Sequence, residues 1–329
     1  MTYRVLGVVM GPGILLALSM GCADRTLPLD AGELPGPQGP ADPPPGSPAP
    51  PTSPPEPAPG PELHIADADG SNLRLLVAGE RPAWSPDGRR IAFQRDGNIH
   101  VIVIDGTGET LLGEGREPAW APDGTRLAFA GRGGIAVMRD DGSDATTLLR
   151  HDFRDDTYAK WDMGVGKPAW SPDGERIAFE HRGDGDMVPA RIFVMNADGS
   201  DPRPVTPTWG FQYAESDPSW SPDGSEIVFW SFGYGIAAVA AAGGTPRQIY
   251  QNDPAVSYGA KPVWSPDGSA ILFTANQFSL AGRAIWVVAR EGGAAGVVIE
   301  GGADPAWSPD GASIVFGRSE GAAFRAPAR

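Results

Sequence analysis

The chain has 329 residues and a formal net charge of −15, and it contains 35 prolines, 45 glycines and one cysteine. The acidic balance argues against a nucleic-acid partner, because phosphate binding requires clustered Lys and Arg and no basic stripe is visible. A single cysteine excludes an internal disulfide. The Pro and Gly content exceeds what one compact core usually holds, so we expect part of the chain to lie outside a folded domain.

Residues 1–22 have the pattern of a secretory signal, with an apolar run that is short for a membrane span and small residues before Cys22. Leu18-Ser19-Met20-Gly21-Cys22 resembles the bacterial lipobox, and this resemblance implies that Cys22 is lipidated and anchors the protein to a membrane. Ser19 stands where that pattern usually has Leu. The alternative is an ordinary signal peptide followed by a free thiol.

Residues 23–61 are dominated by Pro, Gly, Ala and Asp, and they offer almost no apolar side chain to bury. Such a composition is typical of a disordered, extended tether. The sequence therefore predicts an exported protein of the bacterial cell envelope, on the periplasmic or surface side of a membrane. The folded part is then expected to span residues 62–329.

A repeat dominates the remaining sequence. Six tryptophans each begin a Trp-Ser-Pro-Asp-Gly unit, with Ala in place of Ser in the second copy; they are Trp84, Trp120, Trp170, Trp220, Trp264 and Trp307. The spacing of 36 to 50 residues is typical of propeller blades. Ser-Pro-Asp-Gly places Pro at the second position of a tight turn and Gly where a positive φ is needed. Ile or Leu follows every Trp after seven residues, and Phe follows two residues later.

Two further apolar segments follow each hairpin, as at Ile99 to Ile104 and Leu111-Leu112. Four antiparallel strands per repeat make one blade, so we predict an all-β, six-bladed β-propeller. The apolar triplet Ile91-Ala92-Phe93 is typical of a strand that is covered on both faces. Leu63 to Val77 supply a strand pair before the first Trp, and we expect them to complete the blade that begins at Trp307.

The Trp-Ser-Pro-Asp-Gly unit, the Ile-Ala-Phe triplet and the later Ile-x-Val-Met-x-x-Asp-Gly together resemble the repeat of TolB-type β-propellers, over about residues 62–325. The resemblance implies the fold and says little of function, because the matching residues form turns and packing. TolB itself is a soluble periplasmic protein with an α/β domain before its propeller. In this chain the predicted lipid anchor and tether stand in that place.

The connections between strands alternate between the two faces of the propeller. The tight turns fall on one face, and all the long connections fall on the other, which we call the long-loop face. The long connections carry aromatic residues, namely Tyr158, Trp161, Trp209, Phe211, Tyr213, Tyr258 and Phe278. An exposed aromatic rim would form a binding surface. The alternative is that these side chains fold back and cap the blades.

The residue before the first proline of each repeat alternates in charge around the propeller; the six are Arg81, Glu117, Lys167, Asp217, Lys261 and Asp304. We call them the charge ring. These residues enter the innermost strands, so we expect their side chains at the channel mouth on the long-loop face, each between two neighbours of opposite sign. The ring either neutralises itself or forms a polar collar that orients a partner's tail or a small zwitterion.

The sequence predicts no catalytic residue, metal or cofactor. Its four histidines lack metal-ligand spacing, and Asp152, Asp155, Asp156 and Asp162 are more typical of a solvated loop than of a Ca²⁺ site. The leading hypothesis is a monomeric envelope lipoprotein that binds a protein, peptide or glycan as a scaffold. One alternative is a hydrolase or lyase that degrades an envelope polysaccharide or peptide with carboxylates at the channel mouth. The other is a small-ligand sensor.

Overall fold

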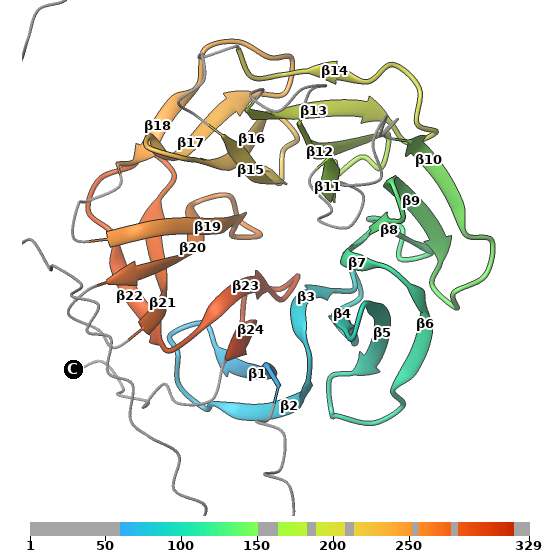
Figure 1. The fold of residues 1–329 in the computed structure, drawn as a ribbon. Helices are drawn as coiled ribbons and strands as arrows, with labels where there is room; N and C mark the ends of the chain where they lie inside the picture. The colour runs from blue at the N-terminus through green and yellow to red at the C-terminus, as the bar shows by residue number, and fades with distance from the viewer. Residues whose placement is uncertain are drawn as a thin grey trace, which may run out of the picture. The chain divides into compact units, whose positions relative to one another are not determined.

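The computed structural model describes residues 60–150, 164–182, 189–207, 214–251, 256–277 and 282–318, with the backbone alone for 256–260 and 277. Every regular element in these ranges is a β-strand (Figure 1). None of these residues forms a helix that is long and apolar enough to cross a bilayer. The predicted signal, Cys22 and almost all of the predicted tether lie outside the described residues.

The strands form six four-stranded antiparallel sheets around a central axis (Figure 1). Blade 1 contains β3 (Glu80–Trp84), β4 (Arg90–Arg95), β5 (Asn98–Val103) and β6 (Thr110–Glu114). Blade 2 contains β7 (Arg116–Trp120), β8 (Arg126–Gly131), β9 (Gly134–Arg139) and β10 (Thr146–Arg150). Blade 3 contains β11 (Val165–Trp170), β12 (Arg176–Arg182), β13 (Ala190–Asn196) and β14 (Arg203–Pro204).

Blade 4 contains β15 (Glu215–Trp220), β16 (Glu226–Ser231), β17 (Gly235–Ala240) and β18 (Arg247–Tyr250). Blade 5 contains β19 (Val256–Trp264), β20 (Ala270–Gln277), β21 (Gly282–Ala289) and β22 (Gly296–Glu300). In every blade, the repeat's Trp ends the innermost strand and pairs with the Ile or Leu seven residues later. The predicted all-β, six-bladed propeller is therefore confirmed.

Blade 6 is assembled from both ends of the described chain. Its inner strands are β23 (Ala303–Trp307) and β24 (Ser313–Arg318), and its outer strands are β1 (Glu62–Asp67) and β2 (Arg74–Ala78). β1 pairs with β24 along its whole length. The ring is closed in this way, as the sequence predicted, so the last blade cannot form until the first strands return to it.

The Ser-Pro-Asp-Gly turns close the innermost hairpins. In blade 1, Gly88 has a φ of 70° and its N–H donates to the Ser85 carbonyl at 2.9 Å. The buried Ser85 hydroxyl accepts the N–H of Arg90 at 2.9 Å and donates to the Asp87 carboxylate. The same bonds from Ser and backbone N–H hold the pKa of Asp267 at about 2. These turns therefore keep their aspartates ionised on the turn face.

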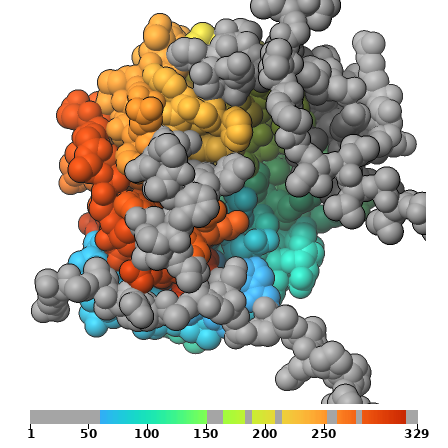
Figure 2. Space-filling view, turned by 60° about the vertical axis from the view of Figure 1, so that its left-hand side comes forward, coloured from blue at the N-terminus to red at the C-terminus, as the bar shows by residue number. Residues whose placement is uncertain are grey.

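Each repeat's Trp lies between two blades. Trp220, for example, packs against Ile192 and Val194 of blade 3 as well as against its own blade. Its indole N–H also donates to the Ala169 carbonyl of blade 3 at 3.1 Å. Blades 4 and 5 lie in continuous contact in the space-filling view (Figure 2). The tryptophans therefore fill the spaces between blades, as predicted.

Truncation of a buried repeat Trp should destabilise the propeller strongly. Trp220→Ala is expected to lower the free energy of unfolding by roughly 3 to 5 kcal/mol, because it opens a cavity between two blades. Trp84→Ala should cost less, since Trp84 is half-buried whereas Trp220 is 6% exposed. Equilibrium unfolding in urea measures both. A loss below about 1 kcal/mol for Trp220→Ala would contradict this role.

The central channel as candidate binding site

The six charge-ring residues all adopt a left-handed backbone, with φ between 49° and 56°. Strand pairing is interrupted at each of them; in blade 1, for instance, the register between β3 and β4 skips from Glu80 to Ala83. A non-glycine residue in this conformation costs roughly 1 to 2 kcal/mol. The proline that follows has no N–H to lose from the sheet. The resulting bulge turns each charged side chain off its strand and toward the axis.

Arg81 lies at the centre of the charge ring. Its guanidinium is 3.7 Å from the Glu117 carboxylate and 3.6 Å from the carboxylates of Asp217 and Asp304. Glu117 and Asp304 belong to the neighbouring blades 2 and 6, but Asp217 belongs to blade 4, on the opposite side of the ring. Pairing between neighbours alone was therefore an incomplete prediction, because Arg81 is long enough to reach across the channel. The three carboxylates raise the pKa of Arg81 in spite of its burial.

Asp217 is the most buried residue of the charge ring, with 8% of its surface exposed. The ammonium of Lys167 lies 3.2 Å from its carboxylate and 3.3 Å from that of Glu180, and it also donates to the Ser216 hydroxyl. Burial opposes the ionisation of Asp217, yet Lys167 and Arg81 hold the pKa of its carboxyl below the ordinary value. Asp217 is thus an ionised group that binds two cations.

Glu117 behaves in the opposite way. Burial raises the pKa of its carboxyl above the ordinary value, although Arg81 and Lys167 both oppose the shift. Its Oε2 accepts the backbone N–H of Lys167 at 2.9 Å. Glu117 and Asp217 both lie near Arg81, yet their pKa values are shifted in opposite directions. Their proton affinities are therefore separated.

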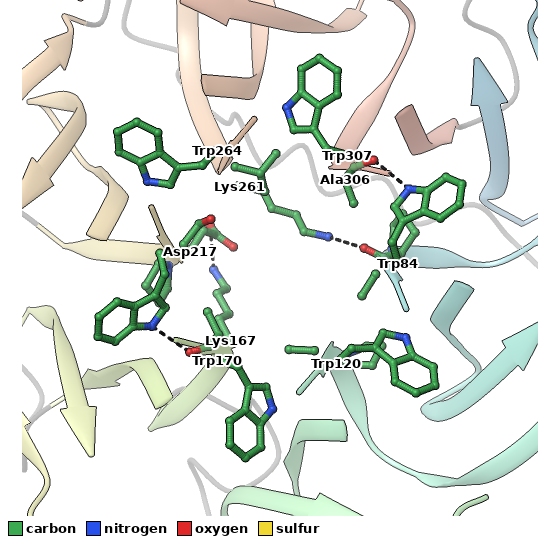
Figure 3. Close-up of a pocket in the computed structure, with 18 of the residues that line it drawn as sticks. Trp84, Trp120, Lys167, Trp170, Asp217, Lys261, Trp264, Ala306 and Trp307 are labelled. Carbon is green, nitrogen blue, oxygen red and sulfur yellow. Dashed lines mark hydrogen bonds and ion pairs between the residues drawn. The ribbon is translucent and has the colours of Figure 1, made fainter. Parts of the chain in front are cut away.

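Lys261 extends across the pocket, and its ammonium donates to the Pro82 carbonyl at 3.2 Å (Figure 3). Within the described residues, no carboxylate lies inside the ion-pair distance of 4.0 Å from this ammonium. Burial lowers the pKa of Lys261, and the ring's carboxylates only partly offset this. An ammonium has three N–H donors, so the carbonyl leaves two of them without a protein acceptor in this part of the chain.

The channel encloses a cavity of about 350 Å³ (Figure 3). In blades 1 to 5 its wall consists of the four-residue segment from the charge-ring residue to the Trp, and in blade 6 it begins at Ala306. One end is therefore ionic, and the rest is Pro, a small or aliphatic residue, and Trp. At blades 5 and 6 the wall also includes the turn residues Pro266, Ser308 and Pro309. A cavity of this size accommodates a few side chains or a small ligand.

Three polar residues that support the ring were missed by the sequence reasoning. Gln94 accepts the Glu117 N–H and Thr274 accepts the Asp304 N–H, both at 2.9 Å. Glu180 pairs with Lys167. All three follow the buried Phe of the second strand, in the blades whose ring residue is basic; the other blades have Ala, Trp or Gly there. The polar residue that follows the apolar triplet in alternate blades could have predicted these three supporting residues.

The predicted aromatic rim lies almost wholly outside the described residues. This holds for Tyr158, Trp161, Trp209, Phe211, Tyr213 and Phe278, and for the acidic residues Asp152, Asp155, Asp156 and Asp162. Tyr258 falls in β19, but its side chain is also outside the description. The rim remains a prediction. Among the described residues, no group of three or more His, Cys, Asp or Glu side chains could hold a metal ion.

Two of the three basic residues of the ring, Arg81 and Lys261, should respond in opposite ways to substitution. Arg81→Met is expected to lower the free energy of unfolding by roughly 2 to 3 kcal/mol, because it leaves three carboxylates without their shared cation. Lys261→Met should raise it by about 1 kcal/mol at pH 7, because it removes a poorly compensated buried charge. Urea unfolding of both variants measures the difference; destabilisation by Lys261→Met would contradict the assignment.

The gain from Lys261→Met should also depend on pH. The folded state lowers the pKa of Lys261, so the unfolded state binds more protons between that lowered pKa and the ordinary lysine value of about 10.4. The wild-type protein therefore recovers stability as the pH rises through this window. We expect the difference between variant and wild type to shrink between pH 7 and about pH 10. A gap that widens would show that Lys261 is stabilised as a cation.

A family model for the TolB beta propeller domain matches residues 154–325, just over half of the chain. No match is found among curated proteins. TolB from Agrobacterium tumefaciens has a similar solved structure, with a TM-score of 0.65 and 20% identity over 79% of this chain and 98% of that chain. For TolB from Acinetobacter baumannii the TM-score is 0.51, with 15% identity over 81% and 65% of the two chains.

An oligogalacturonate lyase in complex with manganese is also similar, with a TM-score of 0.50 and 18% identity over 75% of this chain and 79% of that chain. Identities of this size show likeness of fold alone. The family model, the six closed blades and the repeated Trp-Ser-Pro-Asp-Gly turns agree with one another. This chain belongs to the TolB β-propeller family.

Proposed function

We propose that this protein is a lipid-anchored binding module of the cell envelope, and that it holds a partner protein or peptide at the long-loop face with the charge ring at the centre of the contact. Membership of the TolB β-propeller family supports a protein-binding propeller in general terms. The lipobox-like segment before Cys22 and the Pro-rich tract support export, anchoring and reach. The propeller would then be displayed away from the membrane on its tether.

The incomplete hydrogen bonding of Lys261 carries the proposal. Asp217, Glu117 and Asp304 are each within ion-pair distance of Arg81, whereas the Lys261 ammonium meets a backbone carbonyl. A partner's C-terminal carboxylate, or the side chain of an Asp or Glu, would supply a charged acceptor to its remaining donors. Charge-assisted bonds of this kind are about twice as strong as neutral ones. The ring thus favours an anionic chain end as the group that is recognised.

The backbone of the ring supports the same conclusion. Strained residues persist where the surrounding structure fixes them, and they gather at binding and catalytic sites. All six ring residues are strained in the same way; five of them line the cavity, and the sixth, Asp304, lies 3.6 Å from Arg81. A peptide end fits such a volume better than a flat glycan surface does. Any exposed aromatic residues of the long connections would add apolar contacts around it.

Lys261→Met separates binding from folding, because the variant is expected to be at least as stable as the wild type. The full-length lipidated chain would be crosslinked in its own envelope, purified and compared with Lys261→Met by quantitative mass spectrometry. A specific partner should fall at least about tenfold, since removal of one partner of a buried charge pair costs 2 kcal/mol or more. Trp161→Ala and Trp209→Ala test the rim in the same experiment.

Arg139→Met is the matched control. It removes one positive charge as Lys261→Met does, but Arg139 is exposed and pairs with the exposed Asp144. The proposal requires that this variant keep the partner. Identical partner sets for wild type, Lys261→Met and both Trp variants would reject the long-loop face as the binding surface.

A hydrolase or lyase is the second candidate, and the opposite pKa shifts of Glu117 and Asp217 favour it. An acid and a base with separated proton affinities are what general acid–base catalysis requires. Glu117 would serve as the acid and Asp217 as the base, on an envelope polysaccharide or peptide in the channel. Product release from isolated envelope polymers tests this candidate: turnover abolished by Glu117→Gln supports it, and the lack of turnover by the wild type rejects it.

A further inference from the structure

Four of the six repeat tryptophans carry an arginine over the indole ring. The guanidinium carbon lies 4.7 to 5.5 Å from the ring centroid in the pairs Arg90–Trp120, Arg126–Trp170, Arg176–Trp220 and Arg290–Trp264. In the first three pairs the arginine is the sixth residue after one blade's Trp and covers the Trp of the next blade. Such cation–π contacts are worth about 0.5 to 1 kcal/mol at exposed sites.

Two of these arginines also pair with the aspartate of the tight turn in their own blade. Arg126 lies 3.7 Å from Asp123, and Arg176 lies 3.6 Å from Asp173. In these two pairs the cation is held between the carboxylate of one blade's turn and the indole face of the next blade, whereas Arg90 pairs with Asp140 at 3.1 Å. We call this arrangement a cation seat.

At blade 4 the cation of the seat comes from the neighbouring blade. Glu226 occupies the sixth position after Trp220, and Arg290 from blade 5 covers Trp264 instead. Arg290 lies 3.1 Å from Glu226 and 3.8 Å from Asp223. A cation is thus kept over Trp264 although the arginine has moved to the other side of the blade interface. The seat, and not one particular arginine position, is the feature that recurs.

Blades 5 and 6 lack an arginine at both positions. Ala270 and Ser313 are the sixth residues after Trp264 and Trp307. The positions equivalent to Arg290, identified by the backbone bond to the preceding hairpin, are Ala68 and Ile104. Within the described residues, no guanidinium covers Trp307 or Trp84. Both indoles are half-buried, whereas the four covered ones are 6 to 8% exposed.

The aspartates of these two seats also lack a cation in the described part of the chain. No Lys or Arg there lies within 4.0 Å of the carboxylate of Asp267 or Asp310. Hydrogen bonds from the turn's serines and backbone N–H groups lower the pKa of both carboxyls, so both are ionised at neutral pH. The cavity wall reaches the turns at the same two blades, through Pro266, Ser308 and Pro309.

We propose that the turn face at blades 5, 6 and 1 binds a partner segment with basic side chains. One cation occupies the seat formed by Asp267 and Trp307, and a second occupies the seat formed by Asp310 and Trp84. Arginine fits better than lysine, because its planar guanidinium stacks on an indole while it bonds a carboxylate. The net charge of −15 favours the approach of such a segment. This site faces away from the long-loop face, so it is separate from the charge ring's proposed partner.

The test uses the full-length chain and a terminally blocked Arg-Arg peptide, with the matching citrulline-citrulline peptide as the uncharged probe. Saturation-transfer NMR titrations measure both dissociation constants. We expect the citrulline peptide to bind at least about fivefold more weakly, because it retains the shape but loses the charge. Equal binding of the two peptides would overturn the proposal.

An arginine of the chain itself, placed in either seat, should block the binding of a partner's basic side chain. Ala270→Arg and Ser313→Arg restore the residue that the first three blades carry, and each is expected to weaken Arg-Arg binding by about fivefold. Ala312→Arg is the control: it adds the same charge next to Ser313, at the exposed position that Arg89 occupies in blade 1. The control should bind the peptide nearly as well as the wild type. An equal loss in all three variants would show only general charge repulsion and would reject the seats.

Removal of a seat carboxylate gives an independent result that does not depend on the added arginines folding into place. Asp267→Asn should weaken Arg-Arg binding by about threefold or more, whereas Asp173→Asn should not, because Asp173 already holds Arg176. Circular dichroism of each variant checks that the propeller is folded. Unchanged binding by Asp267→Asn would contradict the proposal.

Discussion

A left-handed residue stands before the first proline of every blade, and the interior of this propeller depends on it. The conformation is unfavourable for an L-residue with a side chain, and it recurs six times. It is tolerated because the next residue, proline, donates nothing to the sheet, and because neighbouring blades supply partners for the displaced groups. Gln94 and Thr274, for example, accept the N–H groups of Glu117 and Asp304. The strain places six charges around one axis.

The two ends of the channel consequently differ in chemistry. At the ring, charges from all sides meet, and Arg81 joins blades 1, 2, 4 and 6 through three carboxylates. Toward the turns, the wall becomes aromatic, and arginines that bridge neighbouring blades cover four of the indoles. Departures from six-fold regularity mark the two proposed binding sites. Within the described residues, Lys261 lacks a carboxylate within ion-pair distance, and Trp307 and Trp84 lack an arginine over the indole ring. In a fully regular propeller, the ammonium and both indoles would have charged partners within the chain.

Most of the fold was predictable from sequence because local chemistry sets it. Turn residues and the constant distance from Trp to Phe determine the hairpins and their register, and the strand pair at Leu63 to Val77 could only complete blade 6. The residues of the charge ring were predicted from the alternating sign of the charge before each repeat's first proline. The left-handed backbone was not predictable, since Arg, Lys and Glu give no signal for it. The contact between Arg81 and Asp217 depends on the width of the channel, and that width cannot be deduced from the spacing of residues in the sequence. The aromatic rim falls outside the described residues, and its role stays a prediction.

The charge ring forms one electrostatic network that is joined across the channel. A double-mutant cycle between Arg81 and Asp217, which lie on opposite blades, tests it directly. The free energy of unfolding would be measured in urea for the wild type, Arg81→Met, Asp217→Asn and the double variant. A joined network predicts a coupling energy of about 1 kcal/mol or more. Additivity within about 0.3 kcal/mol would show that the two residues act independently and that the ring is not one network.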